Sequence, residues 1–565
     1  MISRLFEPPL KATITPSLLL LLILCLSATG AMAGNATWKA QPAPDRNWYT
    51  PANWIPNSVP DGPTDIATFG VSDKSPSINY TSIELDSLVF EAGASSFTIN
   101  VVPNCCPASL TFMGTGITNN AGIVEAFSAF TNGAKNATIT FTNTATAGTQ
   151  TSFLCYAGYN SGDSSFIQFF NASSAGSASF TYGHGDSSRL GASTQFFDSS
   201  TADQGTFLVT GGGNGANVFF YNNSTAASGT FTAAGAVNGW GTRGGNVFLY
   251  DSATAGSGVF TAEGTTYNGG FGGVVTLFGS STADQGVFIA NPAAIGTEGG
   301  VVSFQEGSDG GTARVEVFGN GRFDISGHDS PGVTIGSLEG DGLATLGENN
   351  LTSGSNNLST TFSGTIGDGD VSPDGSLTKI GTGNLTLTGA NTYTGGTIVT
   401  GGILLANNTN GSGTGSGPVQ VTAGTFGGGG KVSGAVSVGT GSGPGAFLGP
   451  GATGVVPGTL TIRKKLTLMA DATYKVTTNS SSVTADKVSA KGVKIRGTQI
   501  LLDDRATSVL ATGTAFTVIN NTAATPISGT FANLADGSTV VVGSNTFQAD
   551  YEGGDGNDLT LTVVP

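Results

Sequence analysis

The sequence predicts an all-β fold, a right-handed parallel β-helix (β-solenoid) of roughly 20 coils with a Trp-rich cap at its N-terminus. Three observations support this prediction: the composition, a repeat in the middle of the chain, and the alternation of apolar and polar residues within each repeat. Of the 565 residues, 89 are Gly and 21 are Pro, and only 10% are charged. Helices take their exposed faces from Glu, Lys, Arg and Ala. This composition therefore indicates a β-protein with a surface of Ser, Thr, Asn and Gly.

The repeat has a fixed internal spacing. Each unit begins with an apolar pair, continues through a turn of small polar residues, and reaches an apolar anchor ten residues after the second member of the pair. Successive anchors lie 27, 24, 29 and 28 residues apart, which indicates a fixed unit with one loop of variable length. The pairs and their anchors are Phe169-Phe170 with Phe180, Phe196-Phe197 with Phe207, Phe220-Tyr221 with Phe231, Leu249-Tyr250 with Phe260, and Leu277-Phe278 with Phe288.

A solenoid explains this spacing, because one unit is too small to bury its apolar residues alone. Stacked units would place like residues above one another at about 4.8 Å. A flat β-sandwich is the alternative. In the solenoid, the alternating residues that face inward are Ile167, Phe169, Val218, Phe220, Val247, Leu249, Val275 and Leu277.

The N-terminal segment has the pattern of a secretory signal peptide. Arg4 and Lys11 form a basic start, residues 18–26 form a short apolar run, and Ala31-Met32-Ala33 offers a cleavage site. A membrane anchor is the alternative, but the run is too short to span about 30 Å of hydrocarbon. The predicted layout is a signal peptide (1–33), an N-terminal cap with the first strands (34–100), the solenoid with repeats of about 27 residues (101–330), a β-strand repeat region (331–465) and a C-terminal β region (466–565).

Charge and cysteine usage narrow the class further. The net charge of −16 and the pI near 4.4 count against nucleic acid as a partner. After the predicted cleavage the chain keeps Cys105, Cys106 and Cys155, an odd number. A disulfide from Cys155 to either neighbour and three unpaired thiols both remain open.

Near the start, Trp38, Trp48 and Trp54 predict a cap that covers the first strand edge, with an aromatic ligand-binding module as the alternative.

A family resemblance enters with residues 375–389, GSLTKIGTGNLTLTG, followed by ANTYTGGT at 390–397. This segment resembles the autotransporter-associated β-strand repeat, also called the passenger-associated transport repeat, of bacterial autotransporter passengers. The resemblance implies a β-helical passenger displayed on or released from a Gram-negative-type cell, commonly as an adhesin or surface structure. Further likeness to such passengers lies at 335–342, 358–364, 448–451, 458–462, 485–488 and 551–559.

A translocator barrel would need many alternating strands after the passenger-like close at 551–559, and we expect this chain to lack one. An unknown outer-membrane translocator or anchor is therefore an expected partner. The expected location is extracellular or at the outer cell surface, with the periplasm as the alternative.

Catalysis is not predicted, although polysaccharide-cleaving enzymes also use β-helices. Such enzymes need grouped carboxylates, and the sequence offers only scattered ones. No cofactor and no metal are predicted either, because the calcium-like turn at 553–559 occurs once, whereas calcium sits between successive copies. The acidic and triad-type candidates are Asp203 and Asp284 in equivalent turns, the group Asp368, Asp370 and Asp374, the pair Asp503-Asp504, and His328-Asp329-Ser330.

One outward stripe is the candidate ligand site. If the first residue of each apolar pair faces inward, the second faces outward, once per coil. Such a stripe flanked by Asn and Ser suits a glycan, and a purely structural aromatic stack is the alternative. The stripe consists of Phe170, Phe197, Tyr221, Tyr250 and Phe278.

These features together predict an exported, non-enzymatic surface protein with a structural or adhesive role. Its expected partners are a glycan or another cell-surface ligand, with self-association open. A secreted polysaccharide lyase or glycosidase and a purely structural envelope scaffold are the alternative functions.

Overall fold

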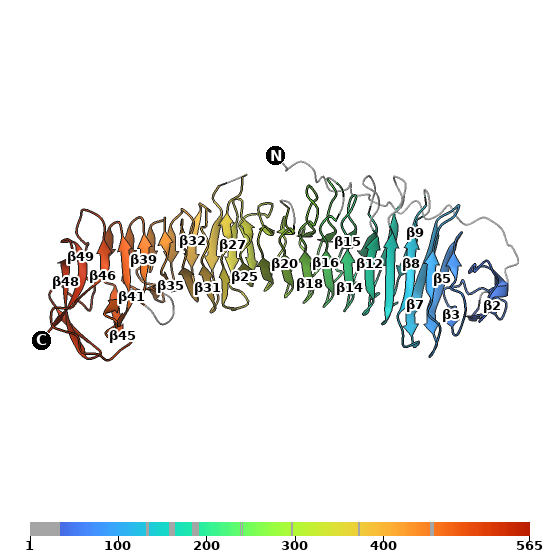
Figure 1. Ribbon diagram of the computed structural model, residues 1–565, viewed down its shortest axis with the longest axis horizontal. Coiled ribbons are helices and arrows are strands. Elements are labelled where there is room, and N and C mark those ends of the chain that lie inside the picture. Colours follow the sequence, from blue (N-terminus) through green and yellow to red (C-terminus); the bar gives the residue numbers. More distant parts are fainter. Residues whose placement is uncertain are drawn as a thin grey trace.

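The computed structural model describes residues 34–565 except 132–134, 157–163, 184–190, 238, 240, 295–297, 371–372 and 452–456. The predicted signal peptide lies outside the described residues. The chain forms a long, gently curved rod in which successive coils stack side by side from the N-terminal end to the C-terminal end (Figure 1). Within the described residues, the only helix is the short 3-10 turn η2 (Pro51–Asn53). None of the described residues forms a helix of the length and apolar character needed to cross a bilayer.

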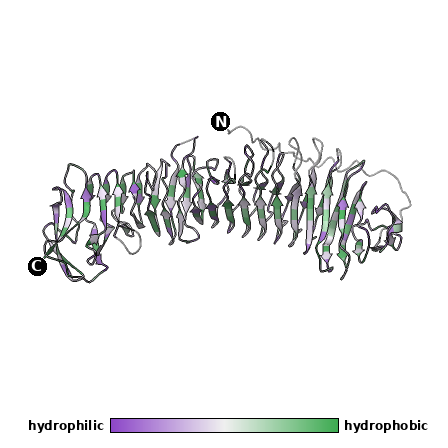
Figure 2. Cartoon of the chain, in the orientation of Figure 1, coloured by the Kyte–Doolittle hydropathy of each residue, from purple (hydrophilic) through white to green (hydrophobic). Residues whose placement is uncertain are grey.

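The predicted parallel β-solenoid is confirmed, and the sandwich alternative is wrong, because strands of successive coils pair in parallel. The number of turns is somewhat lower than the roughly 20 predicted, and among the described residues the first sheet contains 15 strands between Ala36 and Gly367. The difference arises because the length estimate also counted the N-terminal cap and the antiparallel C-terminal strands as ordinary coils. Buried and partly exposed residues alternate along the strands, for example in β15 and β27. Figure 2 shows hydrophobic and hydrophilic residues intermixed along the whole rod.

The first sheet carries the outward stripe. Its strands are β1 (Ala36–Trp38), β2 (Trp54–Ile55), β3 (Ile66–Phe69), β5 (Ser82–Phe90), β7 (Ala108–Asn119), β9 (Ala137–Phe141), β11 (Ser165–Phe169), β13 (Ser193–Phe196), β15 (Asn217–Phe220), β17 (Asn246–Leu249), β19 (Val274–Leu277), β21 (Val301–Phe304), β23 (Arg322–Asp324), β26 (Leu343–Thr345) and β29 (Thr365–Gly367).

The second sheet runs along nearly the whole rod. Its strands are β4 (Ser77–Ile78), β6 (Thr98–Val101), β8 (Glu125–Phe130), β10 (Thr151–Tyr156), β12 (Ser179–Gly183), β14 (Thr206–Val209), β16 (Thr230–Ala233), β18 (Val259–Ala262), β20 (Val287–Ala290), β22 (Arg314–Val317), β25 (Ser337–Gly340), β28 (Thr360–Phe362), β31 (Asn384–Leu387), β33 (Ile403–Ala406), β35 (Gly424–Gly428), β38 (Ala446–Pro450), β41 (Ala472–Asn479), β42 (Thr484–Ala485) and β45 (Gln499–Asp504).

Two further sheets belong to the second half. The third sheet contains β24 (Gly332–Ile335), β27 (Asn350–Ser353), β30 (Ser376–Lys379), β32 (Gly396–Val399), β34 (Val419–Val421), β37 (Val436–Val438), β40 (Leu466–Leu468) and β44 (Val493–Ile495). The fourth contains β36 (Lys431–Val432), β39 (Thr459–Ile462), β43 (Lys487–Ala490), β46 (Ala515–Asn521), β47 (Thr539–Val542), β48 (Asn545–Gly553) and β49 (Asp558–Val564).

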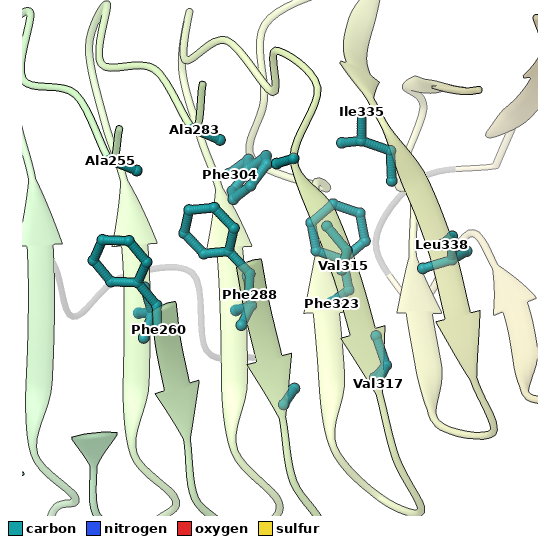
Figure 3. Close-up of a cluster of buried hydrophobic side chains, with 14 of the residues drawn as sticks. Ala255, Phe260, Ala283, Phe288, Phe304, Val315, Val317, Phe323, Ile335 and Leu338 are labelled. Carbon is teal, nitrogen blue, oxygen red and sulfur yellow. The ribbon is translucent and has the colours of Figure 1, made fainter. Parts of the chain in front are cut away.

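The core consists of ladders of identical side chains. The predicted anchors pair in register, with Phe180 beside Phe207, then Phe231 and Phe260. Their rings are parallel, 4.5 Å apart between Phe180 and Phe207 and 4.7 Å between Phe207 and Phe231. Figure 3 shows the same ladder from Phe260 to Phe288. All predicted inward residues have no exposed surface. Burial of each Phe ring contributes about 1.5–3 kcal/mol to the free energy of unfolding. Each pair of stacked rings contributes about 0.5–1.5 kcal/mol more.

The third side of the rod changes along its length. In the repeats this side is a row of single bridges, Thr201 to Thr225 to Thr254 to Thr282 to Asp309. From Gly332 onward it widens into strands of the third sheet. The coil therefore passes from two strands per turn to three.

The Trp-rich segment closes the N-terminal end, which supports the cap interpretation. Trp38, Trp48 and Trp54 are buried and pack edge to face, with ring centroids 5.0 Å and 4.8 Å apart. Their indole N–H groups donate to the carbonyl oxygens of Lys74, Pro60 and Trp48. Strand β2 pairs antiparallel with β1, so the first edge is covered and the rings offer no free polar group to a ligand.

Candidate functional site

The five residues of the outward stripe lie at the ends of first-sheet strands and form a continuous stack. Each is partly exposed. Consecutive rings are parallel within 4° to 11°, and their centroids lie 4.8, 5.1, 5.4 and 5.0 Å apart. These rings are Phe170, Phe197, Tyr221, Tyr250 and Phe278.

The local backbone explains why the stripe is regular. The residue after each ring has a positive φ, 58° at Asn171 and 56° at Asp198, and this turns the chain sharply at one point of every coil. The same side chains tie neighbouring coils together. The backbone N–H of Asn171 donates to Asp198 Oδ2 at 2.9 Å, and that of Asn222 donates to Asp251 Oδ2 at 3.0 Å. Each ring is thus held at a fixed distance from the next.

Two aromatic residues that the sequence analysis missed widen the stripe. Phe219 and Phe248 lie on the outer face of β15 and β17 and are partly exposed. Phe219 lies 5.8 Å from Tyr221 and 5.7 Å from Phe248, measured between ring centroids. The alternation rule could have found them, because the residues on either side of Phe219 both face inward. We call these seven rings the aromatic patch: Phe170, Phe197, Phe219, Tyr221, Phe248, Tyr250 and Phe278.

Amides and carboxylates border the aromatic patch. Gln168 donates to Gln195 at 2.8 Å, and Asn246 donates to Asn217 at 2.9 Å. Both pairs extend along the outer face of the first sheet. Exposed carboxylates occupy the turn beside the rings, at Asp198, Asp251 and Glu306. The patch is therefore an apolar strip with hydrogen-bonding groups along its edges.

The two phenols of the patch remain neutral at physiological pH. Burial raises the pKa of Tyr221 to about 12, and the charge of Asp251 adds to this. The pKa of Tyr250 is also raised, first by burial and then by Tyr221 and Glu306. Their hydroxyl groups can still donate and accept hydrogen bonds.

The stacking decides what a ligand could contact. Parallel rings at this spacing share much of their faces with one another, which stabilises the rod. A ligand would meet the ring edges, the wider centre at Phe219 and Phe248, and the polar border. The geometry favours the structural interpretation of the five-ring stripe, and ligand binding there stays a prediction.

A separate shallow hollow of about 430 Å³ crosses four coils, starting at β7. Its lining is polar apart from Ile117, and several polar groups already have partners. Thr146 Oγ1 accepts from the N–H of Gly148, and Asn119 donates to two carbonyl groups. Asp203 is its one titratable residue.

The carboxylates proposed as catalytic alternatives are not brought together among the described residues. Asp203 and Asp284 occupy equivalent turns in different coils, each with its N–H bound to a Thr hydroxyl. Asp368 is buried and accepts a hydrogen bond from Thr394 Oγ1 at 2.7 Å. Paired carboxylates for glycoside cleavage need a common cleft, which these groups lack.

The triad-type run at 328–330 forms no triad either. The ring nitrogens of His328 contact the backbone oxygens of Asp329 and Ser308, each at 2.7 Å. The imidazole is therefore committed to the backbone of two coils and is not placed to activate a nucleophile.

The calcium-like turn at 553–559 connects β48 to β49. Asp558 is nearly buried and accepts the backbone N–H of Asn521 at 2.8 Å. A different exposed acidic group lies nearby, Asp536, Asp550 and Glu552, with one carboxylate oxygen of each within 4.8 Å of the others. Asp536 and Asp550 already accept backbone N–H groups.

The cysteines answer the question that the sequence left open. Cys155 is buried, whereas Cys105 and Cys106 are exposed, and all three are unpaired. A bridge between Cys155 and either neighbour is not formed.

The segment at 375–397 folds as a stacking module in the middle of the three-sheet region. Asn391 is nearly buried, accepts the N–H of Ile366 from the preceding coil and donates to Gly413 of the following coil. Tyr393 is fully buried, and its hydroxyl bonds to Thr397 at 2.6 Å. The polar residues of this motif therefore join coils to one another.

Comparison with known proteins confirms the predicted resemblance for this segment. Residues 377–406 match the family model described as Passenger-associated-transport-repeat. The chain thus carries the repeat of autotransporter passengers within a passenger-like β-solenoid.

A solved structure with some likeness is the crystal structure of the Haemophilus influenzae Hap adhesin, at 12% identity and a TM-score of 0.31. The match covers 89% of this chain and 64% of that chain, so the sequence spans less than two thirds of the adhesin chain. No curated protein matches the sequence.

Proposed function

We propose that this chain is an exported, non-enzymatic β-solenoid with a structural or adhesive role at the surface of a bacterial cell. The observation that carries the proposal is the passenger-associated-transport repeat at 377–406, seated in register between other coils. The predicted signal peptide is consistent with it.

The fold suits such a role physically. Each coil contacts mainly its neighbours, so the rod can form by adding one coil to the next as the chain emerges from a membrane. Asn391 and the left-handed turn residues satisfy the backbone between coils without needing any partner protein. A long, stiff, acidic rod then presents its outer faces to solvent.

The localisation of the full chain tests this proposal. Intact Gram-negative-type cells that express the chain with its signal peptide are treated with protease, and cells and medium are probed for the protein. We expect degradation on intact cells or recovery from the medium, while a periplasmic marker stays intact. Protection until the outer membrane is opened would make the chain periplasmic and would overturn the surface role.

A second function, glycan binding, is supported by the aromatic patch and its amide and carboxylate border. Neutral polysaccharides are the ligand class, because the carboxylates of Asp198, Asp251 and Glu306 and the net charge of −16 repel polyanions. Tyr221 and Tyr250 offer neutral hydroxyl groups at its centre.

Affinity electrophoresis in gels that contain xylan or hydroxyethyl cellulose tests this function. We expect the wild type to be retarded and the double variant Tyr221→Ser/Tyr250→Ser to migrate freely. Tyr267→Ser is the matched control, because Tyr267 is an exposed tyrosine outside the patch. If both variants are retarded like the wild type, the patch does not bind these glycans. Loss of folding in the double variant would assign the rings a structural role instead.

A further inference from the structure

Two adjacent thiols lie against each other on the surface, in a connection that the proposed function does not use. Cys105 and Cys106 belong to the segment between β6 and β7 and stand between Pro103 and Pro107. Their Sγ atoms are 3.3 Å apart, and both residues are exposed. The sulfur atoms are therefore in van der Waals contact, and a bond of about 2.05 Å would require them to move closer as the turn adjusts.

The surrounding contacts hold this turn in place and leave the thiols accessible. The backbone N–H of Asn104 donates to Asn79 O at 2.9 Å, and its side chain donates to the Tyr80 hydroxyl at 3.1 Å. Both acceptors belong to the preceding coil, so the turn is anchored beside the cysteines.

The third cysteine cannot take part. Cys155 faces the core on β10 with no exposed surface, and burial raises the pKa of its thiol far above the ordinary value. A protonated, buried thiol is inert towards exchange. The hydrogen bond with Cys105 also raises the pKa of Cys106, and the charge of Lys135 offsets this only in part. Cys105 and Cys106 differ from Cys155 in that both are exposed to a reagent.

We propose that Cys105 and Cys106 form a redox site that closes as a vicinal disulfide by exchange with a disulfide donor. One thiolate attacks the donor disulfide and displaces one donor sulfur as a thiol. The second thiolate attacks the resulting mixed disulfide and releases the other donor sulfur. Two S–H bonds of the chain are replaced by one S–S bond, and the two protons and two electrons leave with the donor as two thiols.

The closed form is a small ring that contains the peptide bond between the two residues. Such a ring strains the planar peptide, and strained, exposed disulfides are reduced more readily than structural ones. The site is therefore a reversible lock on the turn between β6 and β7. The proposed export would decide only in which compartment the chain encounters a disulfide donor. A test on purified protein is therefore independent of the proposed function.

Oxidised glutathione is the probe. The chain is first reduced, then incubated with oxidised glutathione and analysed by peptide mapping. We expect the peptide with residues 105 and 106 to lose the mass of two hydrogen atoms and to recover it with a small excess of dithiothreitol. Cys155 should stay unlabelled until the protein is denatured. Persistent mixed disulfides at Cys105 or Cys106, or disulfide-linked dimers, would overturn the proposal.

Single variants supply the matched control. In Cys105→Ser the thiol of Cys106 has no partner, so we expect it to keep the glutathione that the wild type expels. If the wild type stays fully reduced while Cys105→Ser is glutathionylated, ring closure is refuted. If neither reacts, the site is inaccessible and the proposal falls. Phenylarsine oxide, which bridges two close thiols, should bind the reduced wild type and neither single variant, and failure to bind would contradict the observed proximity.

Discussion

The aromatic region (residues 108–324) and the aliphatic region (residues 332–471) fill the same kind of core in two different ways. In the aromatic region two sheets and a row of single bridges enclose the core, and Phe fills it. In the aliphatic region the third sheet adds a strand to each coil, and Leu, Val and Ile predominate, with Phe362, Tyr393 and Phe426 as isolated buried rings. Figure 3 shows the change on the second sheet, where Phe260 and Phe288 give way to Val315 at the end of the aromatic region and then to Leu338 in the aliphatic region.

The difference follows from volume. With two strands per coil, rings from opposite sheets must reach across the core, and Phe207 meets Phe196 edge to face at 5.8 Å. With three strands, residues such as Leu351 and Leu377 approach from the third side and shorten the gap. Close packing then excludes a full Phe ladder. A third strand per coil therefore goes with a core of mostly aliphatic residues.

The two regions also differ in what they carry: one holds the segment that matches a known family, and the other holds the candidate ligand site. The family match lies in the aliphatic region, where polar motif residues join coils. The aromatic patch lies in the aromatic region, on the outer face of the first sheet. A fold can be shared while the exposed residues that define a site differ.

The largest effect is expected for truncation of a core ring. Phe207→Ala removes two parallel ring contacts and one edge-to-face contact, and we expect a loss of about 3–5 kcal/mol. Urea unfolding and the protease resistance of the neighbouring coils measure it. The matched variant Phe197→Ala alters the outer stack, which is partly exposed, and should cost much less. Equal losses would show that the outer stripe carries as much stability as the core.

A smaller loss is expected in the aliphatic region from Asn391→Ala. This change leaves the buried N–H of Ile366 and the carbonyl of Gly413 without partners, at about 1–3 kcal/mol for each group. Hydrogen exchange should increase at both coils flanking the repeat. Asn407→Ala is the control, because Asn407 is partly exposed and its amide oxygen accepts the Gly429 N–H at the surface. Unchanged exchange in Asn391→Ala would mean that the motif does not join the coils.

The repeat at 377–406 also contains a buried amine, Lys379, which gives the aliphatic region a pH-dependent stability. Lys379 ends β30 and points into the core, where burial lowers its pKa to about 8. Between this value and about 10.4 the unfolded chain binds more protons, so stability should rise with pH. Lys379→Met should stabilise the rod at pH 7 by about 1 kcal/mol, net of the hydrogen bond to Ile380, and remove this rise. A thermal melting series from pH 7 to 10 decides it, and a rise that persists in the variant would contradict the assignment.

The sequence was enough for the ladders because a ten-residue spacing and a two-residue alternation specify which side chains share a face. It was not enough for the number of turns, since the antiparallel strands β46 to β49 carry the same composition as coils. The second residue of each apolar pair was enough to predict the stripe, but Phe219 and Phe248 precede these pairs within the strands and were missed. Their rings join the stripe only because β15 and β17 stack in register. The contact between Cys105 and Cys106 depends on a turn conformation that no spacing encodes.

The smallest effect concerns the turns. In the aromatic region Asp198 accepts one backbone N–H, that of Asn171. In the aliphatic region both oxygens of Asp471 accept the N–H groups of Thr440, Gly441 and Gly443. Burial raises the pKa of Asp471, but these donors outweigh it and lower the value to about 2.

This carboxylate therefore contributes stability above the ordinary Asp pKa of about 3.9, and the contribution is lost as the pH falls towards 2. Asp471→Asn should loosen residues 440–443, because an amide has one accepting oxygen. Asp198→Asn keeps the one acceptor that its turn needs and should change little. Proteolysis at 440–443 measures the first change, and proteolysis at the turn around Asn171 and Asp198 measures the second. If the two variants increase proteolysis of their turns equally, the three hydrogen bonds of Asp471 stabilise residues 440–443 no more than the single backbone hydrogen bond of Asp198 stabilises its turn.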